Sequence, residues 1–341
     1  MATTRLIHIT PELPPTVGGI ADYTAILSQR LMEVSNGAVE PVLLRAGKAS
    51  DTEPDVDFRI VDHGRSYSAG ALSTTIEQLT SETSGPAVVL LQYSGYGYAP
   101  RGAPLWLLRA LQQVCGGEGV PLITMFHELY ATGPPWTGAF WVSPMQRYVA
   151  AQLGKLSRAI LTNRVDSANW LRGYVASGTP VRVQSVFSNV GEPENIPSWR
   201  ERQPYAVVFG GKSMKQRLYD RLQPCHINEL QGIGIYQIVD VGSPGAAPET
   251  IHGLPIDERG IQPVEAISAL LRKARAGLLH YPVDYLTKSG IWSGYVAHGV
   301  PSIVISPPRC TRIIREGTHF TRWDPVSPPR SLSVDNFKKS H

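Results

Sequence analysis

Short apolar runs alternate with segments of helical periodicity along most of this chain, and the same opening pattern occurs twice. Residues 6–9 predict a buried strand, a loop rich in proline and glycine follows over 11–19, and residues 20–32 have helical periodicity. The pattern restarts with a strand at 206–209, a glycine turn and a helical segment. Strands that alternate with helices form parallel sheets covered on both faces. The sequence therefore predicts an α/β protein with two Rossmann-like domains.

Further elements fill the two predicted domains. Strands or extended segments are expected at 41–44, 87–91, 121–126, 159–162, 181–186, 235–241, 276–280 and 301–305. Helices are expected at 105–114, 143–156, 165–175, 215–222, 263–274 and 291–297. Residues 191–200 lack periodicity and read as a linker. We therefore predict an acceptor domain over 1–195, a nucleotide-sugar domain over 196–306 and a proline-rich tail over 307–341.

Composition excludes several classes of protein. A hydrophobic fraction of 42% and a charged fraction of 18% are those of a globular protein, and a net charge of +4 over 341 residues is far from a nucleic-acid footprint. Three cysteines without CxxC spacing indicate reduced thiols rather than disulfides or a zinc site. No window reaches the ~18 apolar residues of a membrane span. We expect a cytoplasmic protein that binds no nucleic acid, and contact with a membrane surface stays open.

Three stretches carry a resemblance to a known family. They are PELPPTVGGIADYT at 11–24, MFHELY at 125–130 and HYPVDYLTKSGIWSGYVAHGVP at 280–301. Together they resemble the retaining glycosyltransferases of family four (glycosyl transferases group 1), and the match is collinear over 6–305. The resemblance implies the GT-B fold, in which two Rossmann-like domains face each other across a cleft. It also implies transfer of a sugar from a nucleotide diphosphate sugar to an acceptor hydroxyl with retention. We expect no metal ion and no cofactor, because lysines and backbone amides can stabilise the departing diphosphate without one.

The predicted catalytic residues follow the apolar run that ends at residue 126. His127 and Glu128 stand at the carboxyl end of a predicted strand, where open α/β sheets collect their ligands. The resemblance places His127 beside the transferred sugar. Glu128 has two interpretations that the sequence leaves open, a base toward the acceptor hydroxyl or a helix cap.

The glycine turns after both opening strands predict contacts to the donor. Gly18 and Gly19 allow backbone amides to approach a phosphate or sugar, although a plain tight turn has the same pattern. In the second half Gly211 is followed by Lys212 and Lys215, whose ammonium groups could neutralise a diphosphate. A solvated basic helix face is the alternative for these cations.

A second anion-binding pattern occurs at Lys288, Ser289 and Gly290, which precede a predicted helix. An ammonium, a hydroxyl and backbone amides at a helix N-terminus suit a diphosphate. The sequence departs from the family here, because Leu286 and Gly294 stand where the family has two glutamates. This departure favours an alternative function, a catalytically silent GT-B protein that binds a sugar nucleotide or a partner.

The predicted acceptor contacts are aromatic and polar residues of the first domain. Asp22 and Tyr23 begin the first helix, Gln92 ends a strand, and Tyr130 and Trp136 lie in a loop rich in proline and glycine. Aromatic rings at such positions suit stacking on a sugar. The acceptor, whether carbohydrate, lipid-linked or another small molecule, is left open by the sequence.

A nicotinamide-dependent oxidoreductase is the other alternative with this fold class. Its dinucleotide fingerprint is G-x-G-x-x-G directly after the opening strand. The two loops read Gly18-Gly19-Ile20 and Gly210-Gly211-Lys212, and neither contains that pattern. The sequence therefore disfavours the oxidoreductase.

Overall fold

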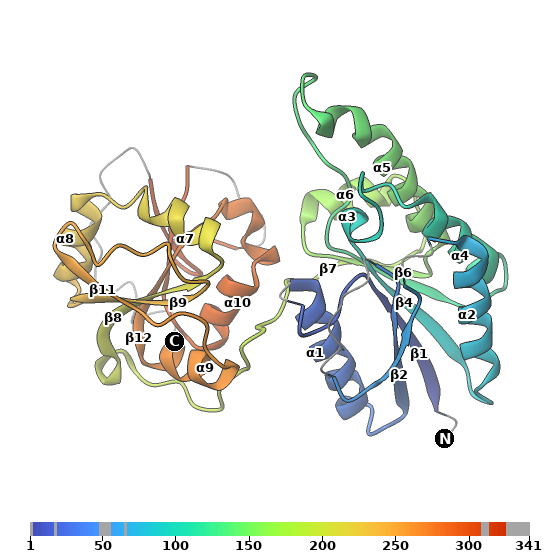
Figure 1. The fold of residues 1–341 in the computed structure, drawn as a ribbon, viewed down its shortest axis with the longest axis horizontal. Helices are drawn as coiled ribbons and strands as arrows, with labels where there is room; N and C mark the ends of the chain where they lie inside the picture. Colours follow the sequence, from blue (N-terminus) through green and yellow to red (C-terminus); the bar gives the residue numbers. More distant parts are fainter. Residues whose placement is uncertain (1–2, 17–18, 48–55, 65–66, 308–313, 325–341) are drawn as a thin grey trace. The chain divides into compact units, whose positions relative to one another are not determined.

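The computed structural model divides the chain into two compact units, Met1–Ser185 and Val186–His341 (Figure 1). It describes residues 3–16, 19–47, 56–64, 67–307 and 314–324. The segment from 186 belongs to the second unit, because the Val186 N–H donates to the Thr287 carbonyl at 3.0 Å and Val190 is buried in that unit's core. The boundary predicted after residue 195 thus falls inside the second unit.

The first unit is a seven-stranded parallel sheet in the order β3-β2-β1-β4-β5-β6-β7, with helices on both faces (Figure 1). Its strands are β1 Thr4–Thr10, β2 Val39–Arg45, β3 Arg59–Asp62, β4 Ala87–Tyr93, β5 Leu122–Phe126, β6 Ala159–Thr162 and β7 Val181–Val183. Its helices are α1 Gly19–Val34, α2 Ala69–Ser81, α3 Gly95–Tyr98, α4 Leu105–Cys115, α5 Gly138–Leu156 and α6 Val165–Arg172. The strand order reverses between β1 and β4, which makes their carboxyl ends the expected ligand site.

The second unit repeats this architecture in the order β10-β11-β9-β8-β12-β13-β14. Its strands are β8 Gln203–Gly210, β9 Gln237–Gly242, β10 Thr250–Ile251, β11 Leu254–Glu258, β12 Ala274–His280, β13 Ser302–Ile305 and β14 Thr321–Trp323. Its helices are α7 Lys212–Tyr219, α8 Pro224–Gly232, α9 Val264–Lys273 and α10 Gly290–Ala297, with 3-10 turns η1 Trp199–Glu201 and η2 Val283–Lys288. Only the β10–β11 pair is antiparallel among the described strands, and the order reverses between β8 and β12.

Close packing of α10 on the second sheet depends on one glycine. A Cβ at Gly277 of β12 would lie 2.5 Å from the Tyr295 ring, so only glycine leaves room for that side chain. The buried Tyr295 hydroxyl lies 3.2 Å from the Leu278 carbonyl oxygen and 3.3 Å from that of Val207. These contacts hold α10, and with it the segment 288–290, at a defined place on the sheet.

Part of the predicted tail, residues 314–324, contributes to the core of the second unit. Strand β14 pairs in parallel with β13, and Ile314, Phe320 and Trp323 are buried. The Trp323 ring stacks on His226 of α8 with 4.8 Å between ring centroids. Strand β14 has three residues, of which only Trp323 is apolar, so no hydrophobic pattern in the sequence indicates it. Among the described helices, none has both the length and the hydropathy needed to cross a bilayer.

Candidate functional site

The carboxyl edge of the first sheet brings several predicted site residues together at the point where the strand order reverses. His127 directly follows β5, and its backbone N–H donates to the Tyr93 carbonyl at 3.0 Å. Gln92 lies in the neighbouring strand β4, and Tyr23 lies in the first turns of α1. Residues from three separate elements thus meet beside the His127 imidazole, because the carboxyl ends of parallel strands lie at the same edge of the sheet.

Behind His127 lies a buried row of hydrogen bonds that the sequence did not predict. His127 Nε2 lies 2.7 Å from Gln92 Oε1, Gln92 Nε2 lies 2.6 Å from His8 Nε2, and His8 Nδ1 lies 2.7 Å from Ser28 Oγ. Burial, together with the charge on His127, lowers the pKa of His8 to about 3, so His8 is neutral near pH 7. The network then assigns the His8 proton to Nδ1 and a proton of His127 to Nε2.

This row gives Gln92 a different role from the predicted acceptor contact. Its side chain is fully buried and its side-chain amide joins two histidines, while its backbone carbonyl oxygen accepts a hydrogen bond of 2.8 Å from the Tyr98 hydroxyl. Gln92 therefore positions His127 and does not line a binding surface. The Tyr23 ring packs edge-on against the His127 ring, with 5.1 Å between ring centroids. Burial raises the pKa of Tyr23 to about 12, so its phenol stays protonated.

Glu12 is a candidate residue that sequence analysis missed. It lies just after β1, half-buried, and its carboxylate accepts a hydrogen bond from the Ala21 N–H in the first turn of α1. Burial raises the pKa of Glu12, and the charge on Asp22 raises it further. The signal that could have found it is an acidic residue at the carboxyl end of the first strand. Gly18, predicted to contact the donor, lies outside the described residues, whereas Gly19 is exposed and begins α1.

Glu128, Tyr130 and Trp136 follow His127 along the chain. Glu128 is exposed, and it does not cap a helix, because the next helix begins at Gly138 with Thr137 as its N-cap. Tyr130 packs edge-on against Trp170 at 5.1 Å. Trp136 is 84% exposed in the loop before α5. Glu128 is therefore not a helix cap, and Trp136 lies on the surface of the first unit.

In the second unit, two glycines end the neighbouring strands β8 and β9 and let their backbones approach closely at the carboxyl edge of the sheet. Gly210 and Gly242 end β8 and β9 with φ of 144° and 112°, values that disfavour residues with a side chain. A Cβ at Gly242 would lie 2.3 Å from the Gly210 carbonyl oxygen. Lys212 is the first residue of α7, is exposed, and lies near Gly245, where a Cβ would be 3.3 Å from its Nζ.

Lys215 is a correction to the predicted donor contacts. Its side chain is fully buried, and its ammonium pairs with the buried Asp240 carboxylate of β9, which also accepts the Tyr219 hydroxyl. The helix α7 begins earlier than predicted, so Lys215 turns toward the sheet and Lys212 toward solvent. Lys215 therefore anchors α7 to β9 and is not available to a diphosphate, while Gly211 is the exposed N-cap of this helix.

The segment Lys288–Gly290 lies at the N-terminus of α10, as the sequence predicted. Ser289 is the N-cap residue, and its hydroxyl oxygen accepts a hydrogen bond of 3.2 Å from the Trp292 N–H. Lys288 is half-buried, with its Nζ 5.9 Å from the Tyr285 ring centroid. Leu286, one of the two positions where the family has a glutamate, is fully buried in the core. At Gly294, the other, a Cβ would already lie 3.2 Å from a Val190 methyl.

Acidic residues and histidines do not gather into a metal site in the part of the chain that the structure describes. The sequence holds one Asp-x-Asp pattern, Asp55-Val56-Asp57, a common metal-binding motif. Asp55 lies outside the described residues and Asp57 is exposed.

Comparisons with known proteins identify the fold. No protein-family model matches the chain, and no curated protein matches it in sequence. Solved structures match it over nearly its full length. A glycosyltransferase from Rickettsia africae covers 99% of this chain and 91% of its own, with a TM-score of 0.58 and 11% identity. An alpha-glucosyltransferase in complex with UDP and a 13-mer DNA covers 99% and 90%, with 0.57 and 10%. The lipopolysaccharide outer core galactosyltransferase WaaB covers 99% and 89%, with 0.52 and 14%.

The chain has the GT-B fold. This confirms the prediction of two Rossmann-like domains. At identities this low the likeness establishes the fold and leaves the activity to the residues of the site. The first unit holds an oriented histidine at the carboxyl edge of its sheet. The second unit holds, at the carboxyl edge of its own sheet, two glycines with positive φ and the helix N-termini that carry Lys212 and Gly290.

Proposed function

We propose that this protein transfers a sugar from a nucleotide diphosphate sugar to an acceptor hydroxyl. The observation that carries the proposal is His127, held through Gln92 and His8 at the carboxyl edge of a GT-B unit. The buried side chains of Gln92, His8 and Ser28 form a hydrogen-bonded row that orients the His127 imidazole, and packing alone does not require such a row. Similar proteins of this fold support the proposal, since one is a galactosyltransferase and another is an alpha-glucosyltransferase complexed with UDP.

The second unit binds the nucleotide diphosphate in this proposal. The ammonium groups of Lys212 and Lys288 neutralise the diphosphate when it is bound and when it leaves. The backbone amides of Gly211 and Gly290 stand at helix N-termini, which favour anions. Ser289 supports this site by capping α10 through its hydroxyl oxygen, rather than by direct contact of that hydroxyl with the diphosphate. The resemblance to family four adds that the transfer retains configuration. Because these cations and amides can stabilise the departing diphosphate by themselves, the proposed transfer needs neither a metal ion nor a cofactor.

The first unit binds the acceptor and the sugar being transferred. His127 orients the sugar, and Tyr23, packed on its edge, limits where the sugar can lie. Glu128 is the exposed carboxylate next to His127 and is the proposed base toward the acceptor hydroxyl. Asp22 and Tyr130 border this region and contact an acceptor that is a carbohydrate, lipid-linked or another small molecule.

A second candidate function is a catalytically silent GT-B protein that binds a sugar nucleotide. The observation that favours it is the packing at the two positions where the family resemblance expects glutamates: Leu286 is fully buried in the core, and a Cβ at Gly294 would press on a Val190 methyl. Loss of a carboxylate from the donor site lowers the affinity or alters the choice of donor.

Calorimetry against UDP, GDP and ADP, followed by donor hydrolysis, tests the proposal and separates these two candidates. We expect one diphosphate to bind, and Lys288→Ala and Lys212→Ala to weaken it about tenfold each, as for loss of a charged hydrogen bond. Lys273→Ala is the matched control, because Lys273 is an exposed lysine at the end of α9. His127→Ala should abolish hydrolysis and leave nucleotide binding unchanged.

Two results would count against the transferase. If no diphosphate binds at millimolar concentration, the donor site is not functional and both candidates are wrong. If a diphosphate binds but hydrolysis and transfer are absent with UDP-, GDP- and ADP-sugars, the silent protein replaces the transferase.

A further inference from the structure

The first half of α5 has the reverse of the usual amphipathic pattern. Its inward positions carry polar side chains, Ser143 and Gln146, and its outward positions carry large apolar ones. The side-chain amide of Gln146 bonds to the backbone of two other segments: it accepts from the Ala131 N–H at 2.6 Å and donates to the Arg101 carbonyl at 2.8 Å. A helix that packs only on its own core would place its apolar residues inside.

The outward residues form a continuous apolar surface, which we call the α5 patch. It consists of Trp136, Phe140, Trp141, Met145 and Tyr148. Trp136 and Trp141 are 84% and 74% exposed, and the other three are between 42% and 51% exposed. Positions 140, 141, 145 and 148 follow the spacing of one helix face. Figure 1 shows that the beginning of α5 and the loop before it project beyond the other helices of the first unit.

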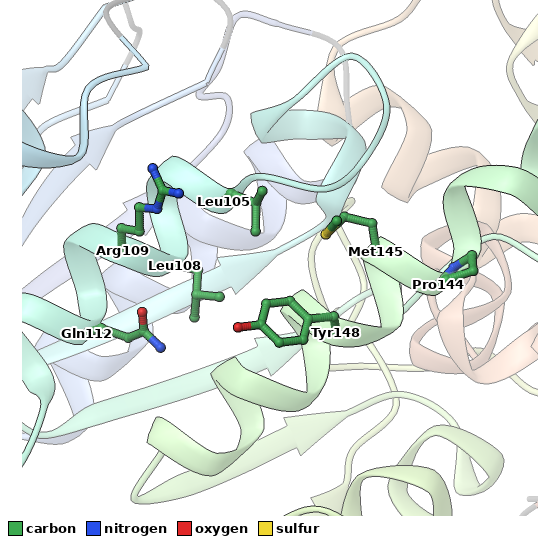
Figure 2. A pocket seen from close by; sticks show the side chains of 7 residues that line it. All are labelled: Leu105, Leu108, Arg109, Gln112, Pro144, Met145 and Tyr148. Atoms are coloured by element: carbon green, nitrogen blue, oxygen red, sulfur yellow. The ribbon is translucent and has the colours of Figure 1, made fainter.

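The α5 patch continues into an open groove between α4 and α5. The groove has a volume of about 530 Å³ and is lined from α4 by Leu105, Leu108, Arg109 and Gln112 and from α5 by Pro144, Met145 and Tyr148. Figure 2 shows the Tyr148 ring extending from α5 toward Leu108 and Gln112. The apolar surface therefore includes this groove as well as the exposed rings. The groove has room for an acyl chain or a lipid headgroup beside α5.

The charged side chains of α4 and α5 are all cationic. Arg101, Arg109, Arg147 and Lys155 are exposed on and beside the two helices. Neither α4 nor α5, both of which the structure describes in full, carries a carboxylate. Arg147 lies over the Tyr130 ring at 4.3 Å, which holds its charge close to the patch. Tryptophan and tyrosine beside cations are the side chains that suit the interface of an anionic bilayer.

We propose that the α5 patch docks this protein on an anionic lipid surface, with the aromatic rings inserted at the headgroup level and the arginines paired with lipid phosphates. The patch lies on the unit proposed to bind the acceptor, but its test does not depend on any sugar transfer. An apolar surface this exposed carries a solubility cost that a lipid partner removes.

Cosedimentation of the full chain with vesicles tests this proposal. The probes are vesicles of phosphatidylcholine alone and vesicles of equimolar phosphatidylcholine and phosphatidylglycerol. We expect binding to the second kind only, weakened by salt. The double variant Phe140→Ser/Trp141→Ser should lower the partition coefficient by about tenfold or more, because membrane binding scales with inserted apolar area. Arg109→Gln and Arg147→Gln should each lower it about fivefold.

Tyr236→Ser provides the matched control, because Tyr236 is 58% exposed in the second unit, and we expect it to bind vesicles like the wild type. Substitutions at such exposed positions leave the fold intact, which circular dichroism verifies. Failure to bind either kind of vesicle overturns the proposal. Equal binding to both kinds overturns the anionic partner. A stable dimer in ultracentrifugation that Trp141→Ser dissociates, without vesicle binding, assigns the patch to a second copy of the chain instead.

Discussion

The carboxyl edge of the first sheet is built from side chains, whereas that of the second is built from backbone. At the first edge, Gln92 and His8 fill the interior and orient His127. At the second, Gly210 and Gly242 leave no room for side chains and bring two strand ends together. Buried side chains at the first edge can fix the orientation of one functional group, here the His127 imidazole. Glycines at the second edge let a charged ligand come close to backbone amides. The two edges thus suit the two roles proposed for them, orientation of the transferred sugar at the first and binding of the diphosphate at the second.

The largest effect is expected from Asp240→Asn, which tests whether the second edge also depends on a buried polar group. The substitution leaves the Lys215 ammonium buried without its charged partner. We expect the free energy of unfolding to fall by about 3–5 kcal/mol in urea denaturation. The double variant Lys215→Met/Asp240→Leu should recover most of this loss. A single variant as stable as the wild type would show that α7 does not need the pair.

Gly242→Ala tests the claim that the second edge is made of backbone. The added Cβ would meet the Gly210 carbonyl oxygen at 2.3 Å, and the φ of 112° adds strain. We expect a loss of roughly 2–4 kcal/mol in unfolding free energy. Gly253→Ala is the matched control, since Gly253 also has positive φ, of 83°, but nothing within 4 Å of its Cβ position. Equal losses in the two variants would show that close approach is unimportant.

The titration of His8 tests whether the first edge is a buried neutral network. Its pKa is about 3 in the folded protein against 6.5 for an unperturbed histidine, so the unfolded chain binds its proton more readily. Stability from this group is complete above about pH 6.5 and is lost as the pH falls toward 3. At pH 5 the loss is about 2 kcal/mol. His8→Gln should reduce the slope of stability against pH below about pH 6.5; an unchanged slope contradicts the assignment.

Ser289→Ala gives the smallest effect and separates two roles at the second edge. Loss of the cap to the Trp292 N–H should cost about 1 kcal/mol in unfolding free energy. Ser289→Asp keeps the cap but adds a negative charge beside the proposed diphosphate, so it should retain stability and weaken nucleotide binding. Calorimetry and urea denaturation of both variants provide the comparison. Nucleotide binding that Ser289→Asp leaves unchanged would place the diphosphate elsewhere.

Central strands could be predicted from the sequence, and edge elements could not. The buried strands β4 and β5 are mostly apolar, whereas β3 (Arg59–Asp62) has two apolar residues and β14 (Thr321–Trp323) has one. Helix α2 contains three threonines or serines before its one glutamate and has weak apolar periodicity. Pairing with a neighbouring strand, rather than local pattern, stabilises such edges.

The candidate site divides in a similar way. His127 and the segment 288–290 were predicted because strand ends and helix starts are local features. The row behind His127 was not, because Gln92 and His8 lie 84 residues apart and meet only through the β1–β4 pairing. Whether the Lys215 side chain points toward the sheet or toward solvent depends on the residue at which α7 begins. The glycine turn before the helix hid that residue, which is Lys212 and not Lys215.

The amide of Gln92 has a consequence for the chemistry of His127. An amide neither takes up nor gives up a proton near neutral pH, so it joins the two imidazoles in space while separating them as acids and bases. A proton that His127 gains or loses during a reaction must therefore be exchanged with solvent or with a bound molecule, and the protein interior acts neither as source nor as sink.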